Sequence, residues 1–414
     1  MKMDIQFIDN GSVSSPLGFL AAGVTAGFKR SGAPDMALLA SECPCRVAGA
    51  FTANLFAAAP VTYDRQILSG ERTVRAVVIN SGIANACTGA RGLEDSRKSA
   101  SLVAEALGVK PEEVLVASTG RIGDFLPMDT MAKGVKLGVE VLSSTGGAAA
   151  ARAIMTTDTR PKSFAVRIDV GGKTVTLGGM TKGAGMICPR LRPAHPKQAT
   201  MLAFVTTDAN ISVAALRASL DSSIDCSFNR ITIDGDTSTN DTFLVLANGK
   251  AGNAEIQPGS PEQRLFAEAL SALAGRLAKE MVKDGEGVTR FVEVNVTGAK
   301  SDADARICAE AIANSELCKT AWFGADPNWG RILCAAGYSG IAFDPAKVNL
   351  DLQHVATVRN GQDAKVATEE ELGKLCDAPE VIIDLDLGSG NGKFTEWTCD
   401  LTYQYEKINA DYHT

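Results

Sequence analysis

The sequence of 414 residues predicts an α+β fold of mixed layers rather than a clean parallel sheet. Two observations predict it. Short apolar strand patterns alternate with amphipathic helix patterns along the whole chain, and several strand pairs carry glycine-rich turns that favour antiparallel pairing. The length is sufficient for two domains or for one large α/β domain.

The first half of the chain predicts two buried strands, one helix and one hairpin. Residues 75–80 (RAVVIN) and 112–119 (EEVLVAST) are apolar runs typical of strands, and the second is expected to break at Thr119-Gly120. Residues 93–108, between them, carry an apolar stripe at helical spacing. Residues 164–187 contain two alternating runs around a Gly-Gly pair, which is the pattern of a β-hairpin.

The clearest helix pattern covers residues 260–285. Ser260 is a suitable N-cap, Pro261 suits the first helical position, and Gln263 follows the cap by three residues. Apolar residues recur at steps of three and four: Phe266, Leu270, Leu273, Leu277 and Met281. Gly285 is expected to stop the helix.

Two further patterns predict strands in the last third of the chain. Residues 291–298 alternate apolar and polar side chains, as a half-buried strand does. Residues 380–402 contain two strand-like runs on either side of a glycine-rich turn, so they predict a second β-hairpin.

Composition and charge narrow the functional class. A net charge of −7 argues against a nucleic-acid binder, and no apolar run approaches the length of a membrane span. Asp4 and Asp9 stand where a secretory signal carries basic residues. Ten scattered cysteines favour reduced thiols in the cytoplasm over a disulfide framework, and Cys43-Pro-Cys45 lacks the second pair of a zinc site.

The sequence also limits the possible nucleophiles. It contains only three histidines, His195, His354 and His413, and no G-x-S-x-G elbow, so a Ser-His-Asp triad is not expected. The glycines near Lys182 lack the spacing of a phosphate-binding loop. A hydroxyl nucleophile that needs no histidine is the remaining option.

An Ala-Thr pair at Ala199-Thr200 fits that option. If the bond between them were cut, the new α-amino group of Thr200 would have a pKa of about 7.7–8.0 and could act as the base. The cutting step would use the same hydroxyl, which attacks the carbonyl of Ala199 before water releases the ester. Taken alone, the dipeptide fits equally well the start of an ordinary strand.

Several segments occur together in a fixed order around this pair, and together they closely resemble the ornithine acetyltransferase family, the glutamate N-acetyltransferases of arginine biosynthesis. The resemblance extends from about residue 10 to the last residue. The segments are ASTGRIG (117–123), AIMTTDTRPK (153–162), TKGAGMI (181–187), ATMLAFVTTDA (199–209), SFNRITIDGDTSTNDT (227–242), DGEG (284–287), DPNWGRI (326–332) and INADYHT (408–414).

The resemblance implies a fold and a reaction. The family fold is a layered α/β/β/α-type sandwich with a smaller C-terminal α/β lobe. The precursor cleaves itself into an α chain, here 1–199, and a β chain, here 200–414, which assemble as α2β2. Thr200 takes acetyl from N-acetylornithine and passes it to glutamate, while the Thr119 hydroxyl and the Gly120 N–H form the oxyanion hole. No metal or prosthetic group is implied, and acetyl-CoA as a further donor is left open.

Substrate-binding residues of the family map onto the T-T-D threonines and five other positions. Thr157 is preferred within T-T-D, with Thr156 as the alternative. Lys182 can oppose a substrate carboxylate and Glu286 can pair with an amino group. The remaining positions are Thr200 itself, Asn409 and Thr414.

The sequence departs from the family in one place. Residues 188–198 (CPRLRPAHPKQ) form a longer and more proline-rich link before Ala199 than family members carry. We favour a surface excursion that leaves cleavage intact, since loops accept extra length cheaply. Two alternatives stay open: a self-cleaving aminopeptidase of related architecture, and an uncleaved homologue that only binds acylated amino acids.

Overall fold

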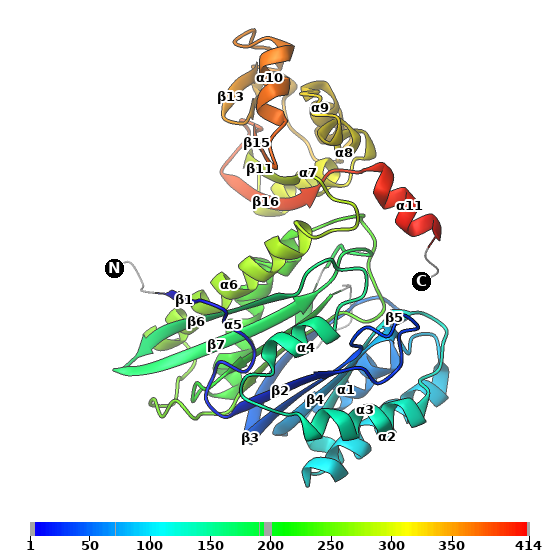
Figure 1. Ribbon diagram of the computed structural model, residues 1–414. Coiled ribbons are helices and arrows are strands. Elements are labelled where there is room, and N and C mark those ends of the chain that lie inside the picture. Colours follow the sequence, from blue (N-terminus) through cyan, green and yellow to red (C-terminus); the bar gives the residue numbers. More distant parts are fainter. Residues whose placement is uncertain (1–4, 71, 190, 194–200, 412–414) are drawn as a thin grey trace. The chain divides into compact units, whose positions relative to one another are not determined.

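The computed structural model describes residues 5–70, 72–189, 191–193 and 201–411 (Figure 1). The chain divides into two compact units. The N-terminal unit comprises residues up to 229 together with 236–281, and the C-terminal unit comprises residues 230–235 together with the chain from 282 onward.

A ten-stranded sheet forms the N-terminal unit. Its strands run in the order β1-β6-β7-β9-β10-β3-β4-β5, with β2 and β8 beside β3. Strand pairs β9–β10 and β4–β5 are parallel and the other pairs are antiparallel, so the expected mixed sheet is confirmed. The strands are β1 (Gln6–Ile8), β2 (Phe19–Val24), β3 (Met36–Phe51), β4 (Val74–Ile83), β5 (Val114–Arg121), β6 (Lys162–Val170), β7 (Lys173–Lys182), β8 (Arg192–Pro193), β9 (Leu202–Thr207) and β10 (Thr242–Ala247).

Strand β3 is shared by two layers of this sheet. Its first part pairs with β2 and β4, its last part pairs with β10, and the register shifts between Ala40 and Cys45. One hydrophobic core joins the two parts, because Phe204 and Leu244 of the β9–β10 side cluster with Leu38 and Val77 of the β3–β4 side.

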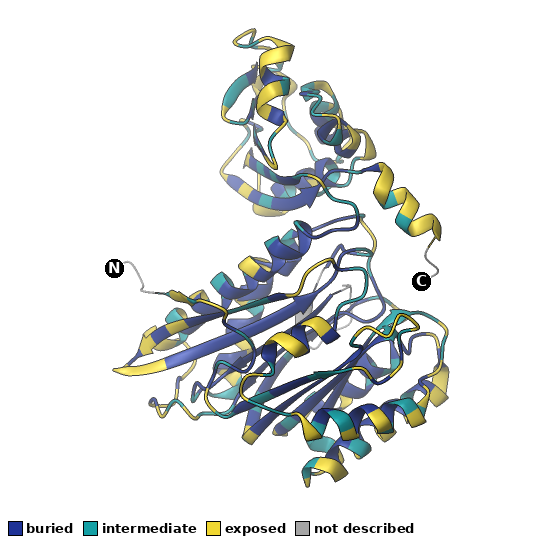
Figure 2. Cartoon of the chain, viewed as in Figure 1, coloured by how far each residue is buried: buried dark blue, intermediate teal, exposed yellow. Residues whose placement is uncertain are grey.

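Helix α6 covers the outer face of one layer and helices α2 and α3 that of the other, whereas α4 contacts strands of both layers (Figures 1 and 2). On β7, Gly179 leaves room for α6, since a Cβ there would lie 2.9 Å from Leu277 Cδ1. Helices α1 and α2 pack on β5, and α3 packs on β2 and β3. The helices are α1 (Ala59–Leu68), α2 (Gly89–Leu107), α3 (Met128–Glu140), α4 (Gly147–Ala153), α5 (Val213–Asp225) and α6 (Pro261–Val282).

The local predictions for this unit are largely confirmed. Helices α2 and α6 and the β6–β7 hairpin stand where the sequence places them, and Gln263 N donates to Ser260 Oγ at 3.0 Å, as an N-cap requires. The break at Thr119-Gly120 is wrong, because β5 continues to Arg121 and pairs Gly120 with Gly82 of β4.

The C-terminal unit contains a six-stranded sheet in the order β14-β13-β12-β15-β11-β16. Helix α7 packs on β11 and β16. The strands are β11 (Phe291–Ala299), β12 (Asn349–Leu352), β13 (Val355–Arg359), β14 (Gln362–Asp363), β15 (Glu380–Asp386) and β16 (Gly392–Cys399). The helices are α7 (Asp302–Ala313), α8 (Glu316–Phe323), α9 (Trp329–Tyr338), α10 (Glu369–Cys376) and α11 (Tyr403–Asp411).

The predicted hairpin over residues 380–402 is wrong in its pairing. Both strands exist, but β11 lies between β15 and β16, parallel to the first and antiparallel to the second. The glycine-rich link therefore crosses the end of β11, where Ser389 N donates to Gly298 O at 2.7 Å. A Cβ on Gly390 would lie 2.5 Å from Ala299 O, so the glycines serve close backbone approach rather than a tight turn.

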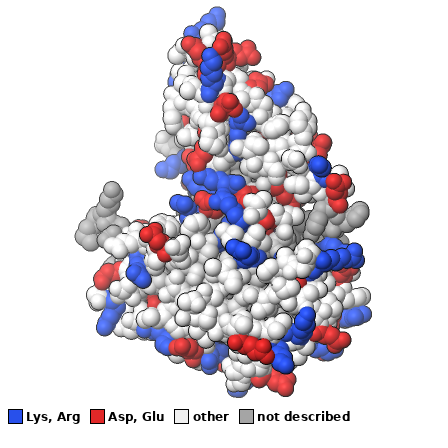
Figure 3. Space-filling view, in the orientation of Figure 1, with Lys and Arg blue, Asp and Glu red and all other residues white. Residues whose placement is uncertain are grey.

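The layered sandwich with a smaller C-terminal α/β lobe is confirmed. The division into residues 1–199 and 200–414 is a prediction about cleavage and stays one. Within the described residues, no helix is both long and apolar enough to span a bilayer. Acidic and basic side chains are interspersed over the face shown in Figure 3.

Candidate active site

The predicted oxyanion turn, Thr119-Gly120, lies in the last residues of β5, where the register with β4 shifts. Gly120 has φ of +126°, and a Cβ on it would lie 2.3 Å from the carbonyl carbon of Gly82 in β4. Only glycine fits such a close approach at this φ without displacing backbone. The sequence prediction of Gly120 as a special position therefore has a structural reason, while its role in catalysis stays a prediction.

The side-chain amide of Asn240 holds Ser118, the residue that precedes this turn. Its Nδ2 donates to Ser118 O at 2.8 Å and to Ala84 O at 2.6 Å, and the residue is only 5% exposed. The Ser118 hydroxyl donates in turn to Asn80 Oδ1 at 2.6 Å. These bonds join the ends of β4 and β5 and hold Thr119-Gly120 in one place.

Lys182 reaches the same turn from the end of β7. Its Nζ donates to Thr119 Oγ1 at 3.2 Å, and the residue is 6% exposed. Thr119 and Lys182, which the sequence predicts as site residues 63 positions apart, are thus brought together. In the β7–β9 register Lys182 stands opposite Leu202, which follows Thr200 by two residues.

Asp158 links the T-T-D segment to this lysine. Its Oδ1 accepts from Gly183 N at 2.8 Å and from Lys162 Nζ at 2.6 Å, and its Oδ2 accepts from Thr156 N at 3.0 Å. Burial alone raises the pKa of this carboxyl, but the ammonium groups of Lys162 and Lys182 and the Gly183 N–H outweigh it and lower the pKa to about 2. The carboxylate therefore stays charged and fixes the chain on both sides of the site.

The two T-T-D threonines are both half-buried. Their backbone is held beside Lys182 through Asp158, but the contacts do not favour Thr157 over Thr156 as a substrate-binding residue. That choice stays a prediction.

Two predicted residues meet in the C-terminal unit. Asn409 Nδ2 donates to Glu286 Oε2 at 2.8 Å. Glu286 is 8% exposed, and Thr402, just before α11, donates its hydroxyl to Gly287 O at 2.8 Å. The D-G-E-G loop and the C-terminal helix are therefore tied together, as a functional tail requires.

Three predicted positions, Ala199, Thr200 and Thr414, lie outside the described residues, as do His195 and His413. His354, the remaining histidine, is largely exposed, and its Nδ1 lies 3.2 Å from Asp384 Oδ2.

The described part of the 188–198 link is not a surface excursion, and that expectation is wrong for these residues. Cys188 and Leu191 are buried, at 5% and 1% exposed. Asn229 Nδ2 donates to Leu191 O at 2.8 Å, and β8 pairs with Ala50 and Phe51 of β3. The buried side chain of Leu191 and the pairing of β8 with β3 hold this part of the link against the sheet.

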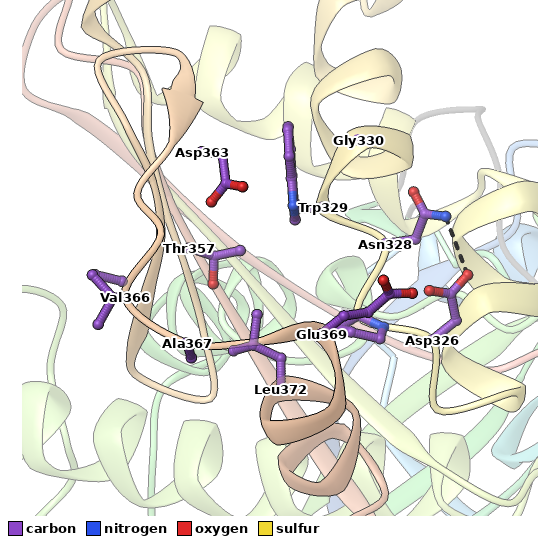
Figure 4. A pocket seen from close by; sticks show the side chains of 12 residues that line it. Asp326, Asn328, Trp329, Gly330, Thr357, Asp363, Val366, Ala367, Glu369 and Leu372 are labelled. Carbon is purple, nitrogen blue, oxygen red and sulfur yellow. Dashed lines mark hydrogen bonds between the residues drawn. The ribbon is translucent and has the colours of Figure 1, made fainter.

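A cavity of about 350 Å³ lies within the C-terminal unit (Figure 4). It holds none of the predicted site residues. The D-P-N-W-G segment forms one wall, where Asn328 caps α9 and its Nδ2 donates to Asp326 Oδ2 at 3.1 Å. Thr357 and Asp363 stand on the other side in Figure 4, and Glu369 also lines the cavity. Within the described residues, no group of three His, Cys, Asp or Glu side chains is arranged to hold a metal ion.

Sequence reasoning missed Asn240, Asp158 and Lys29, a residue of the loop between β2 and β3. Asn240 and Asp158 belong to the T-S-T-N-D and T-T-D segments, but their types alone do not distinguish a clamp from a surface polar residue. What distinguishes these two residues is the group that each one hydrogen-bonds, and that group is distant in the sequence.

We expect Asn240→Ala to lower kcat for the acetyl transfer that the sequence resemblance implies by about tenfold to a hundredfold, because the freed Ser118 carbonyl lets Thr119-Gly120, the predicted oxyanion hole, move. Steady-state kinetics would measure this, with unchanged secondary structure as the check on folding. Asn248→Ala, a loop asparagine of the same unit that bonds Leu17 O instead, is the matched control. Equal kcat in both variants would contradict a positioning role for Asn240.

The fold is a layered α+β sandwich, and its candidate site is a cluster in which a glycine at the end of β5, the Thr119 hydroxyl and the buried Lys182 lie together. The sequence matches the model of the ArgJ family over residues 20–414. The chain therefore belongs to the ArgJ family, and it is an enzyme with an acetyltransferase role in arginine biosynthesis.

Individual relatives agree. The arginine biosynthesis bifunctional protein ArgJ of Symbiobacterium thermophilum is 52% identical over 407 residues, covering 98% of this chain and 99% of that protein. A crystal structure of ArgJ from Bacillus halodurans is 45% identical with a TM-score of 0.50, and the match covers 51% of this chain and all of that one. The ArgJ of Thermosynechococcus vestitus is 46% identical over 420 residues, covering 98% of each chain.

Proposed function

We propose that this chain cleaves itself between Ala199 and Thr200 and then moves an acetyl group from N2-acetyl-L-ornithine to L-glutamate through an acetyl-Thr200 intermediate. The observation that best supports the proposal is the bond from Lys182 Nζ to Thr119 Oγ1 at 3.2 Å. An ammonium group can only donate, so Thr119 accepts there and its own hydroxyl hydrogen can point at an oxyanion.

Self-cleavage would use the Thr200 hydroxyl. Its oxygen attacks the Ala199 carbonyl, the acyl group shifts from nitrogen to oxygen, and water hydrolyses the ester. The products are the Ala199 carboxylate and a free Thr200 amine. Met201, the next residue, is 2% exposed and its carbonyl accepts from Thr242 N at 2.8 Å, so the strand after the cut is firmly held.

Acetyl transfer would follow in two half-reactions. The Thr200 amine accepts the hydroxyl proton while the oxygen attacks the acetyl carbonyl of acetylornithine, and ornithine leaves with that proton. Glutamate then attacks the acetyl ester and releases Thr200. Each step passes through a tetrahedral oxyanion, which the Thr119 hydroxyl and the Gly120 N–H would stabilise by about 3–4 kcal/mol for each donor.

Substrate recognition is proposed to use opposite charges. Lys182 would hold the α-carboxylate, and Glu286, oriented by Asn409, would hold an amino group. Thr157 and Thr414 would complete the contacts. Acetyl-CoA as a further donor and an α2β2 assembly belong to the same proposal.

The solved Bacillus halodurans chain supports processing within the family. The match includes the whole of that solved chain but only 51% of the present chain. The relatives compared by sequence, in contrast, match this chain over nearly their whole length. A crystallised chain of about half length is what a precursor cleaved near its midpoint yields.

The test is the denatured mass of the purified protein, followed by acetyl-transfer and peptide-hydrolysis assays. Two chains split between residues 199 and 200, with transfer to glutamate, are expected. Peptide hydrolysis without transfer would indicate the aminopeptidase alternative. A single inert chain would indicate the binding homologue and would overturn the proposal.

We expect Lys182→Ala to raise the KM for substrate by about tenfold to a hundredfold while leaving cleavage largely intact, because one charge-assisted hydrogen bond to a carboxylate is lost. Steady-state kinetics and denatured mass would measure the two effects separately. Lys173→Ala, at the exposed opposite end of β7, is the control. Loss of cleavage in Lys182→Ala would instead indicate that this lysine acts in precursor processing or folding.

A further inference from the structure

A second lysine approaches the oxyanion turn from another part of the sheet. Lys29 lies in the loop between β2 and β3, and this loop is built around the fully buried carboxylate of Asp35. Asp35 accepts from Ala26 N at 2.7 Å, from Gly27 N at 3.0 Å and from Lys29 N at 2.9 Å. Three such bonds fix the backbone that carries Lys29.

The side chain of Lys29 contacts Gly82, the residue of β4 that pairs with Gly120 of the turn. A Cβ on Gly82 would lie 3.3 Å from Lys29 Cγ, so the lysine stem packs against Gly82. Gly82 is the β4 partner of Gly120, whose missing side chain makes room for the Gly82 carbonyl carbon. The half-buried Lys29 ammonium donates to Pro34 O at 2.7 Å.

Charges around Lys29 place it in the same electrostatic environment as Lys182. The pKa of the Lys29 ammonium is lowered to about 8: burial lowers it most and the charge of Lys182 also lowers it, while Asp35 and Asp158 act in the opposite direction. Two ammonium groups that repel each other beside one turn are both stabilised when an anion binds near them.

We propose that Lys29 is a specificity-determining residue that attracts the second carboxylate of a dicarboxylic acceptor to the oxyanion turn. The inference rests on the proposed function, in which glutamate accepts the acetyl group. Lys182 supplies charge for one carboxylate and Lys29 for the other. A neutral acceptor such as glutamine offers Lys29 no charge to pair with, and an acetylornithine donor carries only one carboxylate.

The test compares both substrates in Lys29→Met, which keeps a flexible stem of similar length and removes the charge. We expect the KM for glutamate to rise roughly tenfold while that for N-acetylornithine changes less than about twofold. The preference for glutamate over glutamine should fall by about the same factor. Lys29→Arg should keep most of that preference, and Arg30→Met, which removes an exposed charge from the same loop, should change neither KM.

A second measurement uses the unaltered enzyme in case Lys29→Met fails to fold. Lys29 should be methylated by formaldehyde and borohydride faster than exposed lysines near pH 8, and glutamate but not glutamine should protect it. Equal protection by both amino acids, or a KM change that is the same for donor and acceptor, would overturn the role of Lys29. Failure of the unaltered enzyme to acetylate glutamate would instead overturn the proposed function, and this inference with it.

Discussion

Replacing Thr200 by alanine is expected to leave one uncut chain of 414 residues and to lower acetyl transfer by about 10⁴-fold or more. Both losses have one cause, because the same hydroxyl would cut the chain and carry the acetyl group. Denatured mass and the rate of acetylglutamate formation measure the two effects. Transfer at the unaltered rate in Thr200→Ala would exclude this residue as the nucleophile.

Thr200→Ser is the matched control for that experiment. It keeps the hydroxyl and the α-amine and removes only one methyl group, so cleavage and part of the transfer rate should survive. In the unaltered enzyme, acetylornithine without glutamate should add one acetyl group to the chain that begins at Thr200, a ping-pong intermediate visible by mass. An acetyl group found on another peptide would contradict the mechanism.

The second large effect concerns stability and involves Asp158. Asp158→Asn removes a carboxylate from Lys162, whose side chain is only 1% exposed and whose Nζ lies 2.6 Å from it. Breaking such a buried pair costs about 3 kcal/mol or more, because a buried ammonium group loses the opposite charge that compensates its burial. We expect the melting temperature to fall by roughly 5 °C. Asp169→Asn, an exposed carboxylate in the β6–β7 hairpin, should change it little.

The stabilisation by Asp158 is expected to depend on pH in one direction. The pKa of Asp158 is about 2 in the folded protein and near 3.8 when the chain is unfolded, so its stabilisation is complete above pH 3.8 and is lost as the pH falls towards 2. The stability gap between the unaltered enzyme and Asp158→Asn should therefore be constant from pH 7 to about 5 and narrow below 4. A gap independent of pH would show that packing, not charge, makes the difference.

A double variant separates the pair from its parts. Lys162→Met added to Asp158→Asn removes the ammonium group that the first change strands, so the double variant should recover part of the lost stability. Simple addition of two destabilising effects would mean that the two side chains contribute independently.

Elements whose pattern is local were predictable from the sequence. Residues 260–285 show their cap and their apolar stripe within one window, and α6 forms there; residues 164–187 show alternation and a Gly-Gly turn, and the β6–β7 hairpin forms there. The candidate site residues Thr119, Gly120 and Lys182 stand in short motifs that the sequence displays. The fold brings the side chains of Thr119 and Lys182 into contact, and the roles of all three stay predictions.

What tertiary structure alone decided is the set of partners. Residues 380–402 look like a hairpin, but β11, from about ninety residues earlier, pairs with both strands because strand pairing depends on which edges meet and not on chain order. Asn240, Asp158 and Lys29 are ordinary polar residues in the sequence. Asn240 matters because it bonds the carbonyl of Ser118, 122 residues away, and Asp158 because it bonds the N–H of Gly183, 25 residues away. Lys29 matters because its stem packs against Gly82 in a neighbouring strand. A hydrogen bond needs a partner at 3 Å, and only the folded chain determines which group stands at that distance.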